Sequence, residues 1–180
     1  MNDKAEKVYA EAFFELCLDE GKPEDVLGEL SALDGIFREE PDFVKLLGTP
    51  TVTMDEKLGM IKDIIADGVS EYTGNLLCVL TERGRMGCFS GIVKNFRALY
   101  NEHFRIAEIT VTASAPLSES VREKIAAKMS EVTGKTVSIK EKVDPSIIGG
   151  VVIDYGSTRY DGSVRTRLNE LKKELGGVIA

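Results

Sequence analysis

Three cysteines and one histidine are the residues whose types could support nucleophilic or metal chemistry. Cys17, Cys78 and Cys88 are odd in number and form no C-x-x-C pair, so they predict neither a disulfide framework nor a zinc knuckle. Adding His103 gives a Cys3His donor set, but the intervals match no zinc-ligand spacing. A Cys–His nucleophilic dyad is the remaining alternative, although Cys17 and Cys78 lie in apolar helical segments, where a free cysteine usually packs as a small hydrophobe. His103 ends a polar helix, where a cation complements the helix dipole. We therefore expect no metal site.

Two further motifs could suggest a nucleotide site or acid–base catalysis. The pair Gly149-Gly150 lacks the Lys-Ser/Thr that follows the glycines of a P-loop, and it has no G-x-G-x-x-G spacing. It is typical of a bulge or a close backbone approach within a buried strand. Asp144, Asp154 and Asp161 lie at turns or strand ends, where aspartate favours turn geometry. We predict a protein with no catalytic residues and no cofactor.

Composition and charge limit the classes of partner. A chain of 180 residues with 43% hydrophobic content can form one large domain or two small ones. The 23 basic and 30 acidic residues give a net charge of −7, which opposes non-specific attraction to nucleic acid or anionic lipid. Residues 1–42 contain 4 basic and 13 acidic side chains, whereas residues 107–180 contain 11 and 10. The acidic start is either a solvated helix face or an electrostatic guide for a basic partner.

Targeting and membrane signals are not predicted. Residues 1–7 are polar and lead directly into an amphipathic helix, unlike a signal or transit peptide. No apolar run approaches the ~20 residues that a bilayer-spanning helix needs. We expect an intracellular chain with no direct membrane insertion, so that any membrane association comes through partners.

Helical periodicity organises the first 105 residues. Apolar residues recur at helical spacing in segments near 3–20, 23–40, 43–47, 53–65, 71–83 and 88–103. Gly21 and Gly84 are stops, Pro23 suits a first helical turn, and Thr53 with Glu56 forms a capping box. Six helices with short connections favour an antiparallel bundle for residues 1–105.

The periodicity changes from helical to alternating at Ile109, which places a domain boundary before residue 106. A strand there precedes a helix that Ser118 caps and Gly134 ends. Further strands flank Asp144-Pro145, and a final helix starts at Ser163. Its apolar residues are Val164, Leu168, Leu171 and Leu175. The order β-α-β-β-α, with a possible extra short strand at 158–160, predicts a small α+β domain over residues 106–180 and an α+β protein as a whole.

Several short sequence motifs of this chain resemble those of a known family. The order VDPSIIGGVVIDYG followed by DGSVRTRL resembles the C-terminal signature of the delta-subunit family of bacterial F-type ATP synthases, whose mitochondrial counterpart is the oligomycin-sensitivity-conferring protein. That family also has similar motifs at the positions of YAEAFFEL, LLCVLTERGRM and ASAPLSES, so the resemblance covers nearly the whole chain. Asp154 departs from the basic or amide side chain that the family pattern favours, which changes the local surface charge.

The resemblance implies a non-catalytic adaptor of the peripheral stalk, or stator, that holds the catalytic head while proton flow drives ATP synthesis. It implies that residues 1–105 bind the N-terminal helix of an alpha subunit, mainly through the first and fifth helices. The matching positions here are Tyr9, Ala12, Phe13, Leu76 and Leu80. The alternative is that the apolar stripes of both helices are buried within the bundle.

For residues 106–180, the resemblance implies binding to the C-terminal end of b-type stalk subunits. The corresponding region is Val137 to Leu175, and its basic Arg159, Arg165 and Arg167 either complement acidic stalk helices or solvate the domain. One copy per complex and a peripheral location at the cytoplasmic face of the bacterial plasma membrane are also implied. The rival classes are a small RNA-binding module and a generic helical adaptor. The sequence shows none of the features expected of an RNA-binding module, which are an exposed aromatic pair on a sheet, a G-x-x-G loop with basic flanks and a basic total charge.

Overall fold

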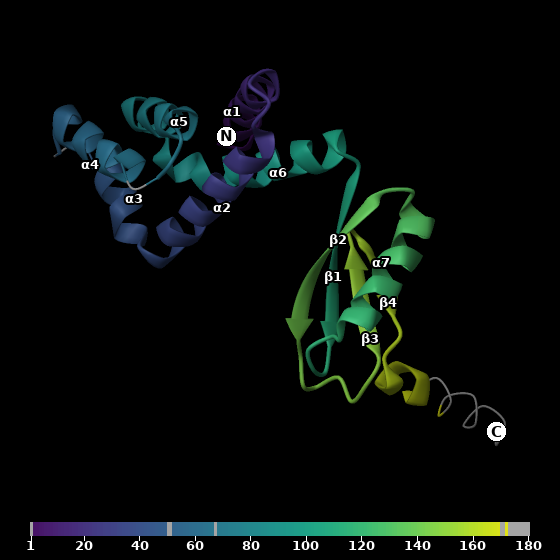
Figure 1. Ribbon diagram of the computed structural model, residues 1–180. Coiled ribbons are helices and arrows are strands. Elements are labelled where there is room, and N and C mark those ends of the chain that lie inside the picture. The colour runs from purple at the N-terminus through teal and green to yellow at the C-terminus, as the bar shows by residue number, and fades with distance from the viewer. Residues whose placement is uncertain (1, 50–51, 67, 170–171, 173–180) are drawn as a thin grey trace. The chain divides into compact units, whose positions relative to one another are not determined.

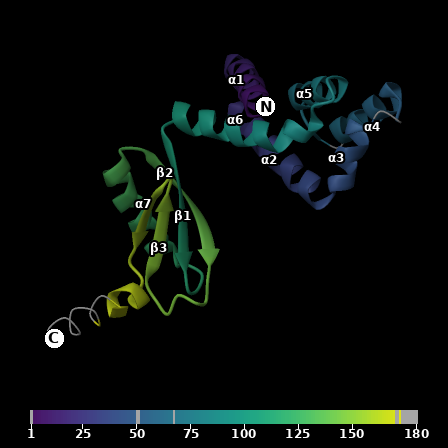
Figure 2. The same cartoon turned by 180° about the vertical axis from the view of Figure 1, so that it is seen from behind.

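The computed structural model describes residues 2–49, 52–66, 68–169 and 172 (Figure 1). The chain divides into two compact units, Met1–Tyr100 and Asn101–Ala180, called here the helical unit and the sheet unit. Helices fill the first, whereas a sheet with one long helix forms the second, as the reverse view also shows (Figure 2). This segregation of helices and strands confirms the α+β class.

The helices of the first unit lie close to the segments that periodicity predicts. In chain order they are α1 (Asn2–Asp19), α2 (Pro23–Glu39), α3 (Pro41–Gly48), α4 (Met54–Ala66), α5 (Glu71–Glu82), the 3-10 turn η1 (Met86–Cys88) and α6 (Phe89–His103). Pro23 occupies the first turn of α2, and the Ser70 hydroxyl caps α5 by accepting a hydrogen bond from the Thr73 N–H. The starts of α2 and α5 are therefore encoded by their own residues.

The predicted capping box at the start of α4 is confirmed. The Thr53 N–H donates to Glu56 Oε2 at 3.0 Å, and the Glu56 N–H donates to Thr53 Oγ1 at 3.4 Å. These hydrogen bonds from Thr53 lower the pKa of the Glu56 carboxyl below its usual range.

An aromatic cluster forms the core of the helical unit. Phe96 on α6 is 0% exposed, and its ring lies 5.7 Å from that of Phe13 and 5.3 Å from that of Phe14. Phe89, also on α6, lies 5.1 Å from the ring of Phe37 on α2. Because offset and edge-on aromatic pairs add to ordinary burial, these contacts fix α1 and α2 against α6.

The sheet unit is built on β1 (Ile106–Ala113), with further elements α7 (Glu119–Thr133), β2 (Thr136–Val143), β3 (Val151–Tyr155) and β4 (Thr158–Asp161). The strand order is β2-β1-β3-β4, with β1 and β2 parallel and the other pairs antiparallel. The crossover helix α7 covers one face, where Met129 packs with Ile109 and Val111. Gly134 ends α7 at φ 66°, as predicted, whereas Ser118 occupies the N-cap position without a side-chain capping hydrogen bond.

The end of the chain contains one short strand more than the β-α-β-β-α order. Asp161 and Ser163 then start a helix over residues 164–169, where the Thr166 N–H donates to Ser163 Oγ at 3.3 Å. Val164 and Leu168 are 41% and 54% exposed. The predicted apolar positions Leu171 and Leu175 lie outside the described residues.

Candidate partner-binding surfaces

Helices α1 and α5 together line a groove of about 250 Å³ on the helical unit. We call it the α1–α5 groove, and its lining residues are Tyr9, Ala12, Phe13, Leu16, Tyr72, Asn75, Leu76 and Val79. Phe13 and Leu76, each 6% exposed, form its apolar floor, whereas Leu16 and Val79 are 44% and 42% exposed. An apolar floor with exposed apolar walls is the form that accepts an amphipathic helix.

The structure brings together most of the residues that the resemblance singles out for head binding. Tyr9, Ala12, Phe13 and Leu76 line the groove, whereas Leu80 is 0% exposed and belongs to the core. Leu16 and Val79 were not among the predicted site residues. Their helical spacing from Ala12, Phe13 and Leu76 places them on the same faces, and this spacing is the signal that could have found them.

Polar side chains hold the two aromatic residues of the groove. Arg85 Nη1 donates to the Tyr9 hydroxyl at 3.2 Å, and the guanidinium carbon lies 5.7 Å from the ring centroid. The Tyr72 hydroxyl donates to Glu20 Oε2 at 2.7 Å, and this bond to a carboxylate raises the pKa of Tyr72. The groove therefore has a cation beside one tyrosine and a carboxylate beside the other.

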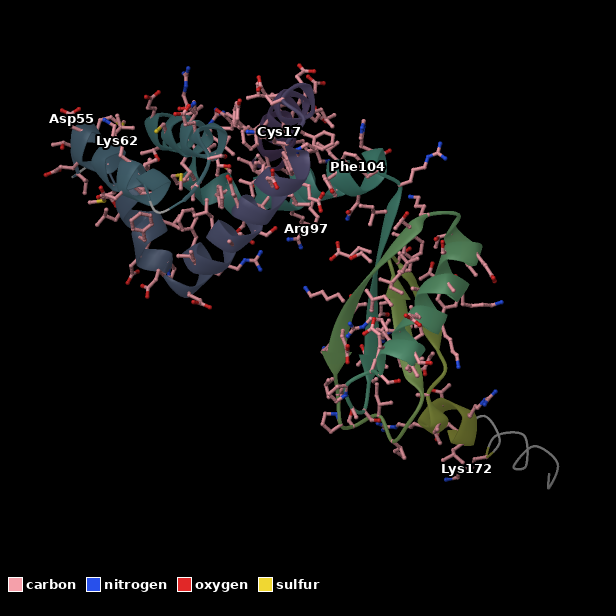
Figure 3. All side chains as sticks on the ribbon, in the orientation of Figure 1. Cys17, Asp55, Lys62, Arg97, Phe104 and Lys172 are labelled. Carbon is pink, nitrogen blue, oxygen red and sulfur yellow. The ribbon has the colours of Figure 1, made fainter. Side chains whose placement is uncertain are left out.

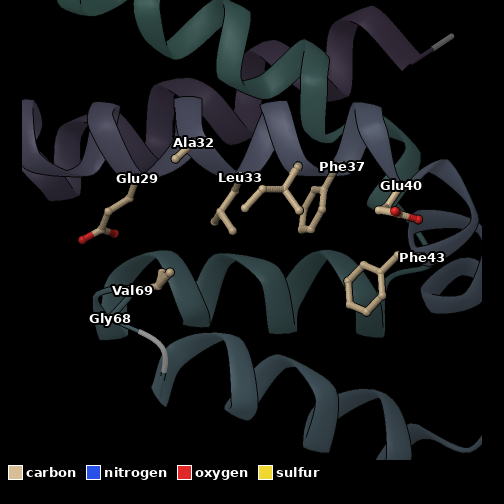
Figure 4. A pocket seen from close by; sticks show the side chains of 9 residues that line it. Glu29, Ala32, Leu33, Phe37, Glu40, Phe43, Gly68 and Val69 are labelled. Carbon is tan, nitrogen blue, oxygen red and sulfur yellow. The ribbon is translucent and has the colours of Figure 1, made fainter.

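A larger hollow of about 570 Å³ lies beside α2 (Figure 4). Leu33 and Phe37 point into it from α2, and Phe43 of α3 faces the same space. The Glu29 carboxylate, at its edge, accepts hydrogen bonds from the hydroxyls of Ser70 and Thr73. Sequence reasoning missed this hollow because the residues of α2 that line it continue the stripe that also fills the core.

The three predicted stalk-binding arginines are exposed but differ in their environments. Arg159 on β4 pairs across the sheet with Asp154 on β3, with Nε–Oδ1 and Nη2–Oδ2 distances of 2.6 and 3.1 Å. Arg165 and Arg167 lie on the helix over residues 164–169. The residue that departs from the family pattern, Asp154, is thus paired with an arginine, and part of the predicted basic charge is neutralised within the unit.

Exposed apolar side chains accompany Arg165 and Arg167. We call Ile148, Val164 and Leu168 the sheet-end patch; Ile148 is 71% exposed. The Val164 N–H donates to the Gly149 carbonyl at 3.0 Å, which brings the loop that carries Ile148 to the start of the helix. The sequence predicts Val164 and Leu168 as apolar positions of an amphipathic helix, and the structure leaves both exposed.

The Asp154–Arg159 pair predicts a specific change in acid titration. The Arg159 guanidinium, by hydrogen bonding, holds the pKa of the Asp154 carboxyl below its usual range. Because the folded-state pKa is lowered, the pair stabilises the fold above the unfolded pKa of about 3.9, and this contribution is lost as the pH falls through the folded value. Arg159→Gln should raise the Asp154 pKa, measured from carboxyl carbon chemical shifts. An unchanged titration would mean that the pair does not form in solution.

Burial raises the pKa of all three free cysteines, which disfavours the nucleophilic thiolate form. Cys17 is 2% exposed, and burial, helped by the Glu29 charge, raises its pKa to about 11. Burial also raises the pKa of Cys78 and Cys88. Among the described residues, no group of three or more His, Cys, Asp or Glu side chains could hold a metal ion. No described helix has both the length and the hydropathy of a membrane span.

Thiol labelling of the folded chain tests the cysteine environments. Because the thiolate is the reactive form, Cys17 should react at neutral pH roughly a hundredfold more slowly than a free cysteine. Denaturant should remove the difference, and mass mapping of the labelled peptides gives each rate. Rapid, selective labelling of one thiol in the folded chain would contradict this result and favour an enzymatic cysteine.

Comparison with known proteins identifies the family. The family model described as "ATP synthase delta (OSCP) subunit" matches residues 5–175. The ATP synthase subunit delta of Anaeromyxobacter sp. (strain Fw109-5) is 34% identical over 93% of this chain and 94% of its own, and that of Alkaliphilus oremlandii (strain OhILAs) is 30% identical over 99% of both. A chain in the cryo-EM structure of the Toxoplasma gondii mitochondrial ATP synthase hexamer shares the fold, with a TM-score of 0.69 and 22% identity over 94% of this chain and 96% of that one. The chain therefore belongs to the ATP synthase delta (OSCP) subunit family and is a non-catalytic component of the peripheral stalk of an F-type ATP synthase.

Proposed function

We propose that the helical unit, with its helices in an antiparallel bundle, binds the N-terminal helix of an alpha subunit in the α1–α5 groove. The sheet unit binds the C-terminal end of the b-type stalk subunits. One copy then joins the catalytic head to the stalk at the cytoplasmic face of a bacterial plasma membrane. The observation that carries the proposal is the groove itself, where exposed Leu16 and Val79 face a shared apolar floor.

A helix in this groove can supply the slow dissociation that an attachment under torque requires. Fully burying a large apolar side chain stabilises by about 1.5–3 kcal/mol, so several anchors on one partner helix can reach the roughly −12 kcal/mol of a nanomolar complex. The Glu20 carboxylate beside Tyr72 and the Arg85 guanidinium beside Tyr9 add opposite charges to the groove. Such charges contribute mainly to the orientation of the partner and to its rate of encounter.

The proposed stalk contact combines the sheet-end patch with two basic side chains. Ile148, Val164 and Leu168 supply exposed apolar area, and Arg165 and Arg167 lie on the same short helix as Val164 and Leu168. This combination suits an amphipathic helix with acidic residues flanking its apolar stripe. Arg159 has a smaller part in the contact because Asp154 already pairs with it.

Calorimetric titration of the full chain tests both attachments separately. One peptide corresponds to the alpha-subunit N-terminal helix of the same organism, and the other to the C-terminal segment of its b-type subunit. Each should bind one-to-one in the presence of the other, and added salt should weaken the stalk peptide more if the arginines face it. Failure of the folded chain to bind the alpha peptide would remove the groove from the proposal.

A further inference from the structure

A third hollow of the helical unit, between α2 and α6, differs from the other two because basic side chains line it. It encloses about 480 Å³ and is called here the cationic pocket. Its lining residues are Ser31, Asp34, Gly35, Arg38, Ser90, Gly91, Val93, Lys94 and Arg97. Its serines and glycines have small side chains or none, and its charged side chains are one aspartate and three cations. Arg97, one of these cations, is seen on the underside of the helical unit in Figure 3.

The cations of the pocket are only partly neutralised. Asp34, whose side chain is 12% exposed, pairs with Arg38 at 2.7 Å and accepts a hydrogen bond from the Ser90 hydroxyl. Arg97 Nη2 instead donates to the Ser31 hydroxyl at 2.7 Å, which carries no charge. Among the described residues, no carboxylate lies within ion-pair distance of Lys94 or Arg97. The lining therefore retains two positive charges.

This local charge is opposite to that of the unit that contains it. Residues 1–100 include 11 basic and 19 acidic side chains, a net charge of −8. Lys94 and Arg97 stand three residues apart on α6, so both side chains project from one helix face. A cationic hollow in an acidic unit attracts anions that the surrounding surface repels.

We propose that the cationic pocket binds a small polyvalent phosphate anion, such as a pyrophosphate or a phosphate ester. The Arg97 guanidinium, already oriented by Ser31, presents its planar donors to phosphate oxygens, and Lys94 supplies a point charge beside it. Arg38 contributes from the opposite wall while remaining paired with Asp34. A volume of about 480 Å³ lies within the range of small-molecule sites and exceeds what one ion needs.

The lining favours a small anion over an acidic protein segment. Among its side chains only Val93 is a large apolar group, and Val93 is 3% exposed, so the hollow offers no apolar anchor of the kind that protein interfaces rely on. The α1–α5 groove, by contrast, supplies exposed leucine and valine. Binding through charge and hydrogen bonds alone is typical of phosphate recognition.

Titration of the full chain with pyrophosphate at low ionic strength tests the site. Saturable one-to-one binding is expected by calorimetry, and Arg97→Gln and Lys94→Gln should each weaken it about tenfold through loss of a charge-assisted hydrogen bond. Arg83→Gln, which removes an exposed cation at the end of α5, should have no effect. Thermal melting of each variant by circular dichroism confirms folding.

A variant that should strengthen pyrophosphate binding distinguishes an electrostatic binding site from a general effect of mutation on packing. The Glu6 side chain lies against Gly91, which is one of the lining residues of the pocket. Glu6→Gln removes a nearby negative charge and should strengthen pyrophosphate binding about twofold. No saturable binding, equal affinity in Arg97→Gln, or binding of an acidic peptide in place of pyrophosphate would each overturn the proposal. Binding of the alpha-subunit N-terminal helix is measured separately, so failure of the pyrophosphate experiment would not affect the proposed function, and failure of the proposed function would not affect the pocket.

Discussion

Replacing Leu16 and Val79 together with aspartate should abolish binding of the alpha-subunit N-terminal helix while the helical unit stays folded. Both side chains are partly exposed, at 44% and 42%, so the free protein accommodates a carboxylate at either position. In the complex, each carboxylate would be buried against an apolar helix without a partner, which costs about 1–3 kcal/mol per group. We expect affinity to fall at least roughly a hundredfold, measured by calorimetric titration.

Ile36→Asp is the matched control for this pair. Ile36 is 54% exposed and lines the larger hollow beside α2 in the same unit. It should leave binding of the alpha helix unchanged, and melting temperatures should agree among the variants. If Ile36→Asp abolishes binding and the groove variant does not, the partner helix occupies the larger hollow and the proposed site is wrong.

The buried members of the groove are poorer probes of binding. Phe13 and Leu76 are each 6% exposed, and the Phe13 ring packs 5.7 Å from that of Phe96. A charge at either position would be buried in the free protein as well, so it would destabilise the fold before any partner arrives. A groove residue and a core residue share the same stripe, and only exposure in the structure distinguishes Val79 from Leu80.

Helix boundaries were readable from the sequence because their signals are local. The Thr53–Glu56 box and Pro23 each involve residues within one turn of the helix start. The same holds for Gly134, which adopts a left-handed conformation just after α7. These signals need no knowledge of distant segments, although Ser118 takes the N-cap position of α7 without the side-chain hydrogen bond of a cap.

Features that depend on distant segments were not readable. The pairing of Asp154 with Arg159 requires the β3–β4 register, and the cationic pocket requires α2 to lie beside α6. Val164 has helical spacing typical of a buried stripe, but its burial depends on what the neighbouring loop and strands cover. Burial and charge pairing across elements are properties of the packed chain, whereas periodicity reports only which residues share a face.

Gly150→Ala should destabilise the sheet unit by about 3 kcal/mol, because Gly150 combines a left-handed backbone with a backbone contact. Its φ is +81°, and an added Cβ would lie 2.4 Å from the Gly162 carbonyl oxygen. Backbone on both sides must then move, since no flexible side chain can give way. Unfolding of the sheet unit, monitored by circular dichroism, should have its midpoint at a lower denaturant concentration.

Gly149→Ala provides the control one residue away. There the added Cβ would meet only Val164 Cγ2, at 3.4 Å, and the backbone is not left-handed. Its cost should therefore stay below about 1 kcal/mol. Equal stability of both variants would mean that the approach of Gly150 to Gly162 does not hold this turn. If only Gly150→Ala is unstable, the structural requirement for glycine lies at Gly150, whose backbone approaches that of Gly162.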